Sequence, residues 1–341
     1  MQVAAVSPPE PPSTDAFLRA VGDDGTVAPA FAAEAARLVE LWRGVARIRR
    51  TSQRLVALQR EGKIGSHASP IGEEGALVGA VAALAEGDWV FPSAREALVS
   101  TLRGVTAEAY VHHAFGDARD PLEGRVPPDH LCSRAARVAP PPGTLGGHLT
   151  HAVGCAWAMR NDGAVVLAFL DGAAASTGHF HDALNFAGVF RAPVVFVCRN
   201  DGRREVDAAT EGGLAGKAVG YGLPSAQVDG SDAVAVLAVV SEAASRARRG
   251  EGASLVEVLT SPPLDGTLDV PVDRDPLLTL ERAIDRAGGD PSRAKVLDEL
   301  DQELARAAAA AVGAGVAPRS SIFDNVYREL PGHLRAQKGR P

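Results

Sequence analysis

A strand–helix–strand unit over residues 163–201 constrains the fold of this chain most. The segments GAVVLAFL (163–170) and APVVFVCRND (192–201) are nearly continuous apolar runs, and GHFHDALNFAGVF (178–190) between them has helical spacing. Unbroken apolar runs are typical of strands buried on both faces, and a helical crossover joins parallel strands. The sequence therefore predicts an α/β fold with a doubly wound, mostly parallel sheet flanked by helices.

The other predicted elements flank this unit, and they divide the chain into three parts. An N-terminal arm rich in Pro and acidic residues (1–28) is expected to be mobile rather than part of the core, an α/β domain follows (29–262), and a loop with C-terminal helices forms an appendage (263–341). We predict helices at 29–60, 72–84, from about 95, 233–249, 275–287 and 291–312. Strands are expected in DWVFPS and near 227–232 and 253–260. The irregular segment 116–147 is expected to be a functional loop.

Charge and cysteine usage exclude several classes of protein. The chain has 35 Lys and Arg against 42 Asp and Glu, a net charge of −7, and it lacks the basic run that nucleic-acid binding requires. No apolar run reaches the roughly 20 residues of a membrane span, and the N-terminal residues lack a signal-peptide pattern. Because Cys132, Cys155 and Cys198 are far apart, a disulfide framework is not expected and a reducing, cytoplasmic location is.

Polar turns follow both central strands. Asp171, Gly172 and Ala173 end the first, and Asp201 ends the second. Ligands of doubly wound sheets bind at the carboxyl ends of the strands, and the helix that begins near Gly178 would aim its N-terminus at the same place. This arrangement suits a diphosphate with a divalent cation. For Asp171 and for Asp201 a local alternative stays open, because an Asp at either position can also cap a turn or a helix.

The same region resembles a known family. The stretch LAFLDGAAASTGHFHDALNFAGVFRAPVVFVCRNDG resembles the thiamine-diphosphate motif of the alpha subunits of pyruvate and branched-chain 2-oxo acid dehydrogenases. Further blocks, such as IGEEGALVGAVAAL, GHLTHAVGCAWA and IFDNVYRELPGHLRAQ, match the family in the same order over about residues 35–337. The resemblance implies a thiamine-diphosphate-binding fold for 29–262, with thiamine diphosphate and Mg²⁺ as cofactors. It also implies a beta-type subunit in an α2β2 heterotetramer, oxidative decarboxylation of a 2-oxo acid, and acyl transfer to a lipoyl-bearing acyltransferase.

The resemblance implies roles for several residues, because they match functional positions of the family. Arg95 matches a diphosphate-binding arginine, and Gly143 and Leu145 match positions whose backbone meets the cofactor pyrimidine. His130 matches the histidine of the family's MPxH loop and is our predicted catalytic residue. Each has a simpler alternative: Arg95 could form a surface ion pair, and His130 could be merely solvated.

The resemblance places the metal and diphosphate contacts on the two turns. Gly172 and Ala173 are predicted cofactor contacts, and Asp171, Asp201 and the backbone carbonyl of Arg203 are predicted metal ligands. Gly172 occupies the position of the family's metal-binding acid, and Asp201 that of its Asn. Mg²⁺ requires oxygen ligands in near-octahedral geometry, which a glycine side chain cannot provide.

Other positions also depart from the family. Ala94 replaces a phosphate-contacting Tyr, and Pro262 and Gly266 replace an Arg and a His that face the diphosphate and the reacting centre. Three hypotheses follow: an alpha-type dehydrogenase subunit, a non-catalytic paralogue that serves as a structural or regulatory partner, or a different ligand held in the old cleft by Asp171, Asp201 and Arg95. Outside the site, we expect Glu73 and Glu74 to cap a helix, and His148 and His151 to be structural.

Overall fold

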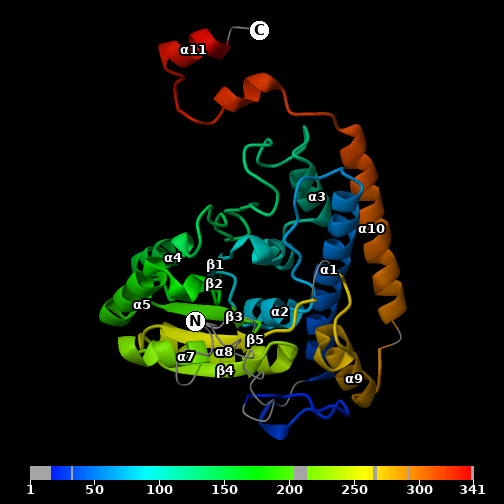
Figure 1. The fold of residues 1–341 in the computed structure, drawn as a ribbon, viewed down its shortest axis with the longest axis vertical. Helices are drawn as coiled ribbons and strands as arrows, with labels where there is room; N and C mark the ends of the chain where they lie inside the picture. The colour runs from blue at the N-terminus through cyan, green and yellow to red at the C-terminus, as the bar shows by residue number, and fades with distance from the viewer. Residues whose placement is uncertain (1–16, 32–33, 203–212, 264–266, 291, 339–341) are drawn as a thin grey trace, which may run out of the picture.

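A five-stranded, fully parallel sheet forms the centre of the computed structural model, which describes residues 17–31, 34–202, 213–263, 267–290 and 292–338 (Figure 1). The strand order is β1-β2-β3-β5-β4. The strands are β1 (Trp89–Phe91), β2 (Val166–Asp171), β3 (Val194–Asn200), β4 (Ser225–Asp229) and β5 (Ser254–Leu259). The predicted α/β class and parallel sheet are confirmed, and the strands at the centre lie where the apolar runs placed them.

The helices connect and cover these strands. The α-helices are α1 (Ala35–Arg60), α2 (Glu74–Ala82), α3 (Ala107–Phe115), α4 (Gly147–Ala158), α5 (Gly178–Phe190), α7 (Gly213–Gly216), α8 (Ala233–Arg248), α9 (Pro276–Arg286), α10 (Arg293–Gly313) and α11 (Gly332–Lys338). The helix predicted from Arg95 is a 3-10 helix, η3 (Ala94–Arg103), with further short 3-10 turns η2 (Pro29–Phe31), η4 (Ala174–Ser176), η5 (Lys217–Tyr221), η6 (Val272–Arg274) and η7 (Arg319–Phe323). No helix in these described ranges has both the length and the apolar character to cross a membrane.

Each face of the sheet has its own hydrophobic core because side chains alternate along a strand. Leu167 and Phe169 of β2 pack into a core with α1, α2, α8 and α10, whereas Val166, Ala168 and Leu170 pack into a second core with α4 and α5. In Figure 1, α4 and α5 (green) accordingly lie apart from α1 (blue) and α10 (orange). The buried strands explain why their sequence shows no polar alternation.

Close packing of α2 on α8 explains the small residues of GALVGAVAAL. A Cβ atom added to Gly79 would lie 2.6 Å from the backbone oxygen of Ala233 and 2.7 Å from Cβ of Val236. Because real Cβ atoms do not approach other atoms so closely, only glycine permits this helix contact. The contact holds the start of α2, and with it Glu73, against the strand ends.

The prediction of an N-terminal arm outside the core is wrong for residues 17–28, which belong to the folded body. Leu18 pairs in parallel with Val228 beside β4, and Ala20 and Val21 are buried. The backbone N–H groups of Ala20 and Val21 donate to Oδ2 of Asp232, at 2.6 and 2.7 Å. These partners lie over 200 residues away in sequence, so local composition could not reveal them. The rest of the predicted arm, residues 1–16, lies outside the described residues.

The C-terminal region is likewise no simple appendage. Helix α10 runs alongside α1 in Figure 1, and it contributes Leu300, Leu304 and Ala307 to the core that covers one face of the sheet. Only its last part extends away from the body: α11 buries no residue and lies far from the sheet (Figure 1). The described residues after 262 contain no strand, as predicted.

Candidate functional site

The two polar turns lie side by side at the carboxyl edge of the sheet, as the sequence predicted. Asp171 of β2 pairs with Arg199 of β3, and the backbone N–H of Gly172 donates to the carbonyl of Arg199 at 3.1 Å. After β3, Oδ1 of Asn200 accepts the backbone N–H of Gly202 at 2.8 Å, which closes a tight turn around Asp201. Asp171 and Asp201 are both half-buried. The structure therefore places the two residues that we predict to bind metal at the ends of adjacent strands.

Asp171 also has the capping role that the sequence left open. Its Oδ1 accepts the backbone N–H of Ala174 at 2.8 Å, at the start of the 3-10 turn η4. Gly172 is buried and Ala173 half-buried in the same turn. One carboxylate oxygen thus fixes the turn, and a metal role for Asp171 would depend on its other oxygen.

A buried ion-pair cluster lies beside these turns, and the sequence analysis did not predict it. Nη1 of Arg199 donates to Oε1 of Glu73 at 2.7 Å, and its Nε pairs with Glu96. The hydroxyl of Thr260, just after β5, donates to the same Glu73 oxygen at 3.0 Å. The three charged side chains are at most 5% exposed. The available signal was the charge of Arg199 at the end of an otherwise apolar strand.

Electrostatics in this cluster favour the charged forms. Burial raises the pKa of Glu96, but Arg199 and the hydrogen bonds from Ser93 outweigh it, so that the net pKa is lowered. Burial disfavours the charged form of Arg199 as well, yet the attraction of Glu73 and Glu96 raises its pKa further above its ordinary value. Two carboxylates share one buried guanidinium, and the cluster therefore needs a second cation.

Arg95 supplies that second cation from the surface side. Its Nη1 lies 3.6 Å from Oε2 of Glu73 and donates to the carbonyl of Ser69 at 3.2 Å. The side chain is 43% exposed, in contrast to the buried Arg199. An ion pair of Arg95 is therefore present, as the alternative expected, although its partner Glu73 is buried and not on the surface.

The prediction that Glu73 and Glu74 cap a helix is wrong. Neither makes a side-chain cap on α2; Glu74 instead pairs with the buried Arg49 of α1, which also donates to Asp275 at 3.0 and 3.2 Å. The reason is physical: a buried carboxylate gains more from a charged guanidinium than from neutral backbone N–H groups. Both acids thus tie α2 to distant elements.

His148 has the structural role that we expected. Its Nε2 donates to the carbonyl of Phe169 at 2.6 Å, and the side chain is buried at the start of α4. Burial lowers the pKa of His148 below its ordinary value, more than the bond to Phe169 and the nearby Glu96 and Asp171 raise it. The imidazole is therefore neutral and anchors α4 to β2.

The predicted catalytic histidine lies in the irregular segment before α4. His130 is half-buried, and its Nδ1 lies 3.0 Å from the carbonyl of Pro128. Gly143 has open space around it, and Leu145, with half its surface exposed, stands just before α4. The catalytic role of His130 stays a prediction.

The loop after β5 approaches the site at Gly72. A Cβ atom on Gly72 would lie 2.7 Å from the Ser261 carbonyl oxygen and 3.0 Å from Cα of Pro262. Arg203 and Gly266 lie outside the described residues. Within the described ranges, no group of three or more His, Cys, Asp or Glu side chains could hold a metal ion.

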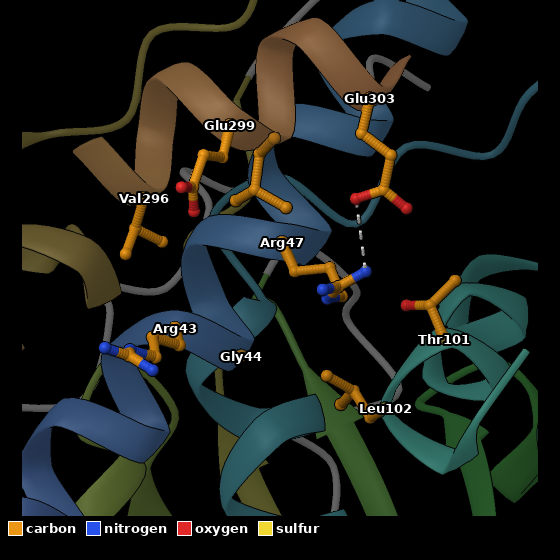
Figure 2. Close-up of a pocket in the computed structure, with 9 residues that line it drawn as sticks. Arg43, Gly44, Arg47, Thr101, Leu102, Val296, Glu299 and Glu303 are labelled. Atoms are coloured by element: carbon orange, nitrogen blue, oxygen red, sulfur yellow. Dashed lines mark ion pairs between the residues drawn. The ribbon is translucent and has the colours of Figure 1, made fainter. Parts of the chain in front are cut away.

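Two hollows lie away from the strand ends. A cavity of about 410 Å³ between α1, η3 and α10 contains two arginines and two glutamates, and Arg47 lies 3.9 Å from Glu303 there (Figure 2). An apolar groove of about 390 Å³ runs between α4 and α5, where Trp157 and Phe190 are nearly half exposed. None of the predicted site residues lines either hollow, so neither is the candidate site.

Comparisons with known proteins agree with this arrangement. The family profile described as "Dehydrogenase E1 component" matches residues 43–261. The chain is 32% identical to "2-oxoisovalerate dehydrogenase subunit alpha" of Bacillus subtilis (strain 168) over 313 residues, which cover 85% of this chain and 94% of that protein.

Two further relatives have similar descriptions. Identity is 38% over 214 residues to "3-methyl-2-oxobutanoate dehydrogenase subunit alpha" of Mycobacterium tuberculosis (strain CDC 1551 / Oshkosh), covering 60% of this chain and 55% of the relative. It is 29% over 332 residues to the mitochondrial "2-oxoisovalerate dehydrogenase subunit alpha" of Mus musculus, covering 88% and 73%.

Proposed function

Because the chain belongs to the dehydrogenase E1 component family, as an alpha subunit of a 2-oxo acid dehydrogenase, we propose that it acts on branched-chain 2-oxo acids. The observation that carries the substrate class is the near full-length match to the Bacillus relative, whose printed name specifies 2-oxoisovalerate. The names of the Mycobacterium and mouse proteins specify the same class of acid. The proposed reaction is oxidative decarboxylation with acyl transfer to a lipoyl-bearing acyltransferase.

The family depends on thiamine diphosphate, and we propose that the turns at Asp171 and Asp201 bind its diphosphate together with Mg²⁺. Mg²⁺ in proteins is commonly held by one or two carboxylates, with substrate phosphates and water completing the octahedron. Asp171 and Asp201, on neighbouring strand ends, could supply those carboxylates, with the carbonyl of Arg203 as a third ligand. Arg95 would pair with the diphosphate from the exposed side, beside the turn of Gly172 and Ala173.

When bound, thiamine diphosphate would supply a nucleophilic ylid carbon and a cationic thiazolium ring that takes up the negative charge left by decarboxylation. The chain's own contribution is to orient and to exchange protons. Since a carbonyl only accepts hydrogen bonds, Nδ1 of His130 must donate to Pro128, which leaves Nε2 of a neutral imidazole as a proton acceptor. We therefore assign Nε2 of His130 as the atom that holds or moves a proton, and the backbone of Gly143 and Leu145 as a support for the pyrimidine.

A beta-type subunit is the proposed partner. Helix α5 exposes Phe186 and Phe190, which line the groove between α4 and α5, and also Val189; these side chains are 51%, 47% and 70% exposed. Apolar patches of this kind on a folded chain are typical of protein interfaces. In the family such a partner completes the cofactor site, in an α2β2 heterotetramer. A cytoplasmic location is also proposed, supported by Cys132, Cys155 and Cys198, which form no disulfide.

A second candidate function is a non-catalytic partner of a dehydrogenase subunit. Its specific support is the replacement of the expected metal-binding acid by Gly172, together with Pro262 at the position of a cationic side chain. In this case the family fold serves assembly, and the carboxylate of Asp171 keeps only its role in the turn after β2.

An activity assay on the assembled protein separates the two candidates. The chain, co-purified with its beta-type subunit, is supplied with thiamine diphosphate and Mg²⁺, and reduction of an artificial electron acceptor is followed with 3-methyl-2-oxobutanoate or pyruvate. We expect turnover that requires both cofactors, favours the branched-chain acid, and is lost in His130→Ala but not in His151→Ala, which removes an exposed imidazole. An intact complex without turnover would instead support the non-catalytic candidate.

A further inference from the structure

A buried chain of hydrogen bonds approaches Arg95 from the interior. The carbonyl of Ser69 accepts from Arg95 Nη1 at 3.2 Å. The hydroxyl of Ser69 lies 2.9 Å from that of Ser52 on α1, and the Ser52 hydroxyl lies 2.9 Å from Nε2 of His67. Ser52 is fully buried, and the His67 side chain is 2% exposed. One guanidinium of the proposed cofactor site is therefore linked to a buried imidazole.

The other end of this chain holds the loop that carries His130. Nδ1 of His67 donates to Oδ1 of Asp129 at 2.9 Å, and Asp129 directly precedes His130. The same carboxylate accepts the hydroxyl of Tyr110 at 2.8 Å and the backbone N–H of Ala68 at 2.6 Å. Asp129 has a φ of +60°, a left-handed conformation that costs energy for a residue with a side chain. These hydrogen bonds stabilise that conformation.

The directions of the bonds follow from the chemistry of the carboxylate. An ionised Asp129 only accepts, so Nδ1 of His67 and the hydroxyl of Tyr110 both donate to it. In a neutral imidazole Nε2 then accepts from Ser52, whose oxygen can accept in turn from Ser69. Burial and the neighbouring Asp129 raise the pKa of Tyr110 well above its ordinary value, which keeps the phenol protonated as a donor. All donors thus point toward one carboxylate.

We propose that His67 and Asp129 are positioning residues: they hold the loop of His130 and the segment that anchors Arg95 in one fixed relation. The proposal rests on the proposed function, because it assigns a purpose to the link between two of its site residues. Position x of the MPxH-type loop is Asp129 here. The residue beside the predicted catalytic histidine therefore sets the backbone from which that histidine projects.

The same residues cannot form a hydrolytic triad, because a substrate has no access to the serine. Ser52, His67 and Asp129 have the hydrogen-bond order of a Ser–His–Asp triad, with both distances at 2.9 Å. The Ser52 side chain, however, has no exposed surface, and its hydroxyl also bonds to Ser69. A nucleophile must reach its substrate, and this hydroxyl cannot. The three residues therefore have a structural role and not a catalytic one.

Asp120, which lies in the same irregular segment as Asp129, offers a matched control. Nδ1 of His113 lies 3.0 Å from Oδ1 of Asp120, and both side chains are fully buried. Asp120 also accepts the backbone N–H groups of Leu122 and Gly124, at 2.9 and 2.7 Å. No bond in the described ranges connects this pair to Ser52 or Arg95. Asp120→Asn therefore removes a carboxylate of the same kind without touching the proposed link.

The test uses the complex of the chain with its beta-type subunit and compares Asp129→Asn with Asp120→Asn. Without cofactor, we expect Asp129→Asn to speed amide hydrogen exchange at least about tenfold at the non-proline residues of both 127–131 and 66–70, since a charge-assisted bond to a buried group is lost. With cofactor, we expect kcat to fall about 10–100-fold at nearly constant KM, because misplaced catalytic groups slow the chemical step. Asp129→Glu, which keeps the charge, should recover part of kcat.

Asp120→Asn should speed exchange only around 118–124 and leave kcat almost unchanged. The proposal is wrong if exchange at 66–70 does not respond to Asp129→Asn, or if Asp120→Asn lowers kcat equally. Should Asp129→Asn fail to fold, Ser52→Ala removes one hydroxyl from the middle of the chain and must loosen 66–70 on the same measurement. A wild-type complex without turnover would contradict the proposed function, while the exchange data would still decide whether the two segments are coupled.

Discussion

Replacement of Arg199 by Met removes the one buried cation that Glu73 and Glu96 share. All three side chains are at most 5% exposed, so the substitution leaves two carboxylates inside the protein with Thr260, Ser93 and the distant Arg95 as their remaining partners. Removing one partner of a buried ion pair costs about 3–5 kcal/mol in the free energy of unfolding. With an unfolding entropy of about 2.1 cal/mol/K per residue, this chain loses about 4–7 °C in Tm.

Differential scanning calorimetry of the alpha–beta complex measures this change. The control is Arg249→Met, which removes an exposed arginine that also pairs with two carboxylates, those of Glu251 and Glu242. Because solvent screens that cluster, we expect no measurable shift in Tm. A fall of less than about 2 °C for Arg199→Met would refute the reasoning, and so would an equal fall in the control, since burial would then not decide the effect.

Three further changes test other parts of the account. Gly79→Ala should lower the free energy of unfolding by about 1–3 kcal/mol in denaturant titration, because its Cβ would meet the Ala233 carbonyl at 2.6 Å; an unchanged midpoint would show that α2 and α8 can separate freely. The lowered pKa of His148 makes its contribution to stability complete above its ordinary pKa of 6.5 and lost as pH falls below that value. His148→Gln should therefore flatten the fall of Tm between about pH 6.5 and 5, and a parallel fall would disprove the assignment. Gly172→Glu restores an acid at the family's metal position and should tighten Mg²⁺-dependent cofactor binding at least about tenfold by calorimetry; weaker binding would show that Asp171 and Asp201 already complete the site.

The centre of the fold was predictable from the sequence because its signals are local. The apolar runs that form β2 and β3 and the helical spacing of α5 lie within 163–201, and the structure places Asp171 and Asp201 on adjacent strand ends as expected. Parallel strands require a crossover, and the chain between them is long enough for only one helix. Topology then fixed the edge at which the candidate site lies.

The errors concern residues whose partners are remote in sequence. Residues 17–28 have the composition of an arm, yet Ala20 and Val21 are fixed by a carboxylate over 200 residues away. Glu73 begins a helix, where capping is the ordinary role, but the buried Arg199 is 126 residues distant. No propensity or spacing rule contains such information, because long-range pairs depend on the finished fold.

The positioning residues were missed for a similar reason. His67 is 15 residues from Ser52 and 62 residues from Asp129, and the loop motif that contains Asp129 singles out His130 rather than its neighbour. The sequence did indicate that the irregular segment before α4 has a function, and it singled out His130. It could not show that the neighbouring Asp129 is buried with a left-handed backbone, since that conformation depends on Tyr110 and His67 together.

Calorimetric titration of thiamine diphosphate with Mg²⁺ into the alpha–beta complex tests the central claim most directly. If Asp201 and its neighbours hold the cofactor, the complex should bind it with a Kd in the micromolar range, about −8 kcal/mol, and Asp201→Ala should weaken binding at least about tenfold through loss of a charged ligand. An intact complex that releases no heat at millimolar cofactor would contradict the account and leave assembly as the function of this chain.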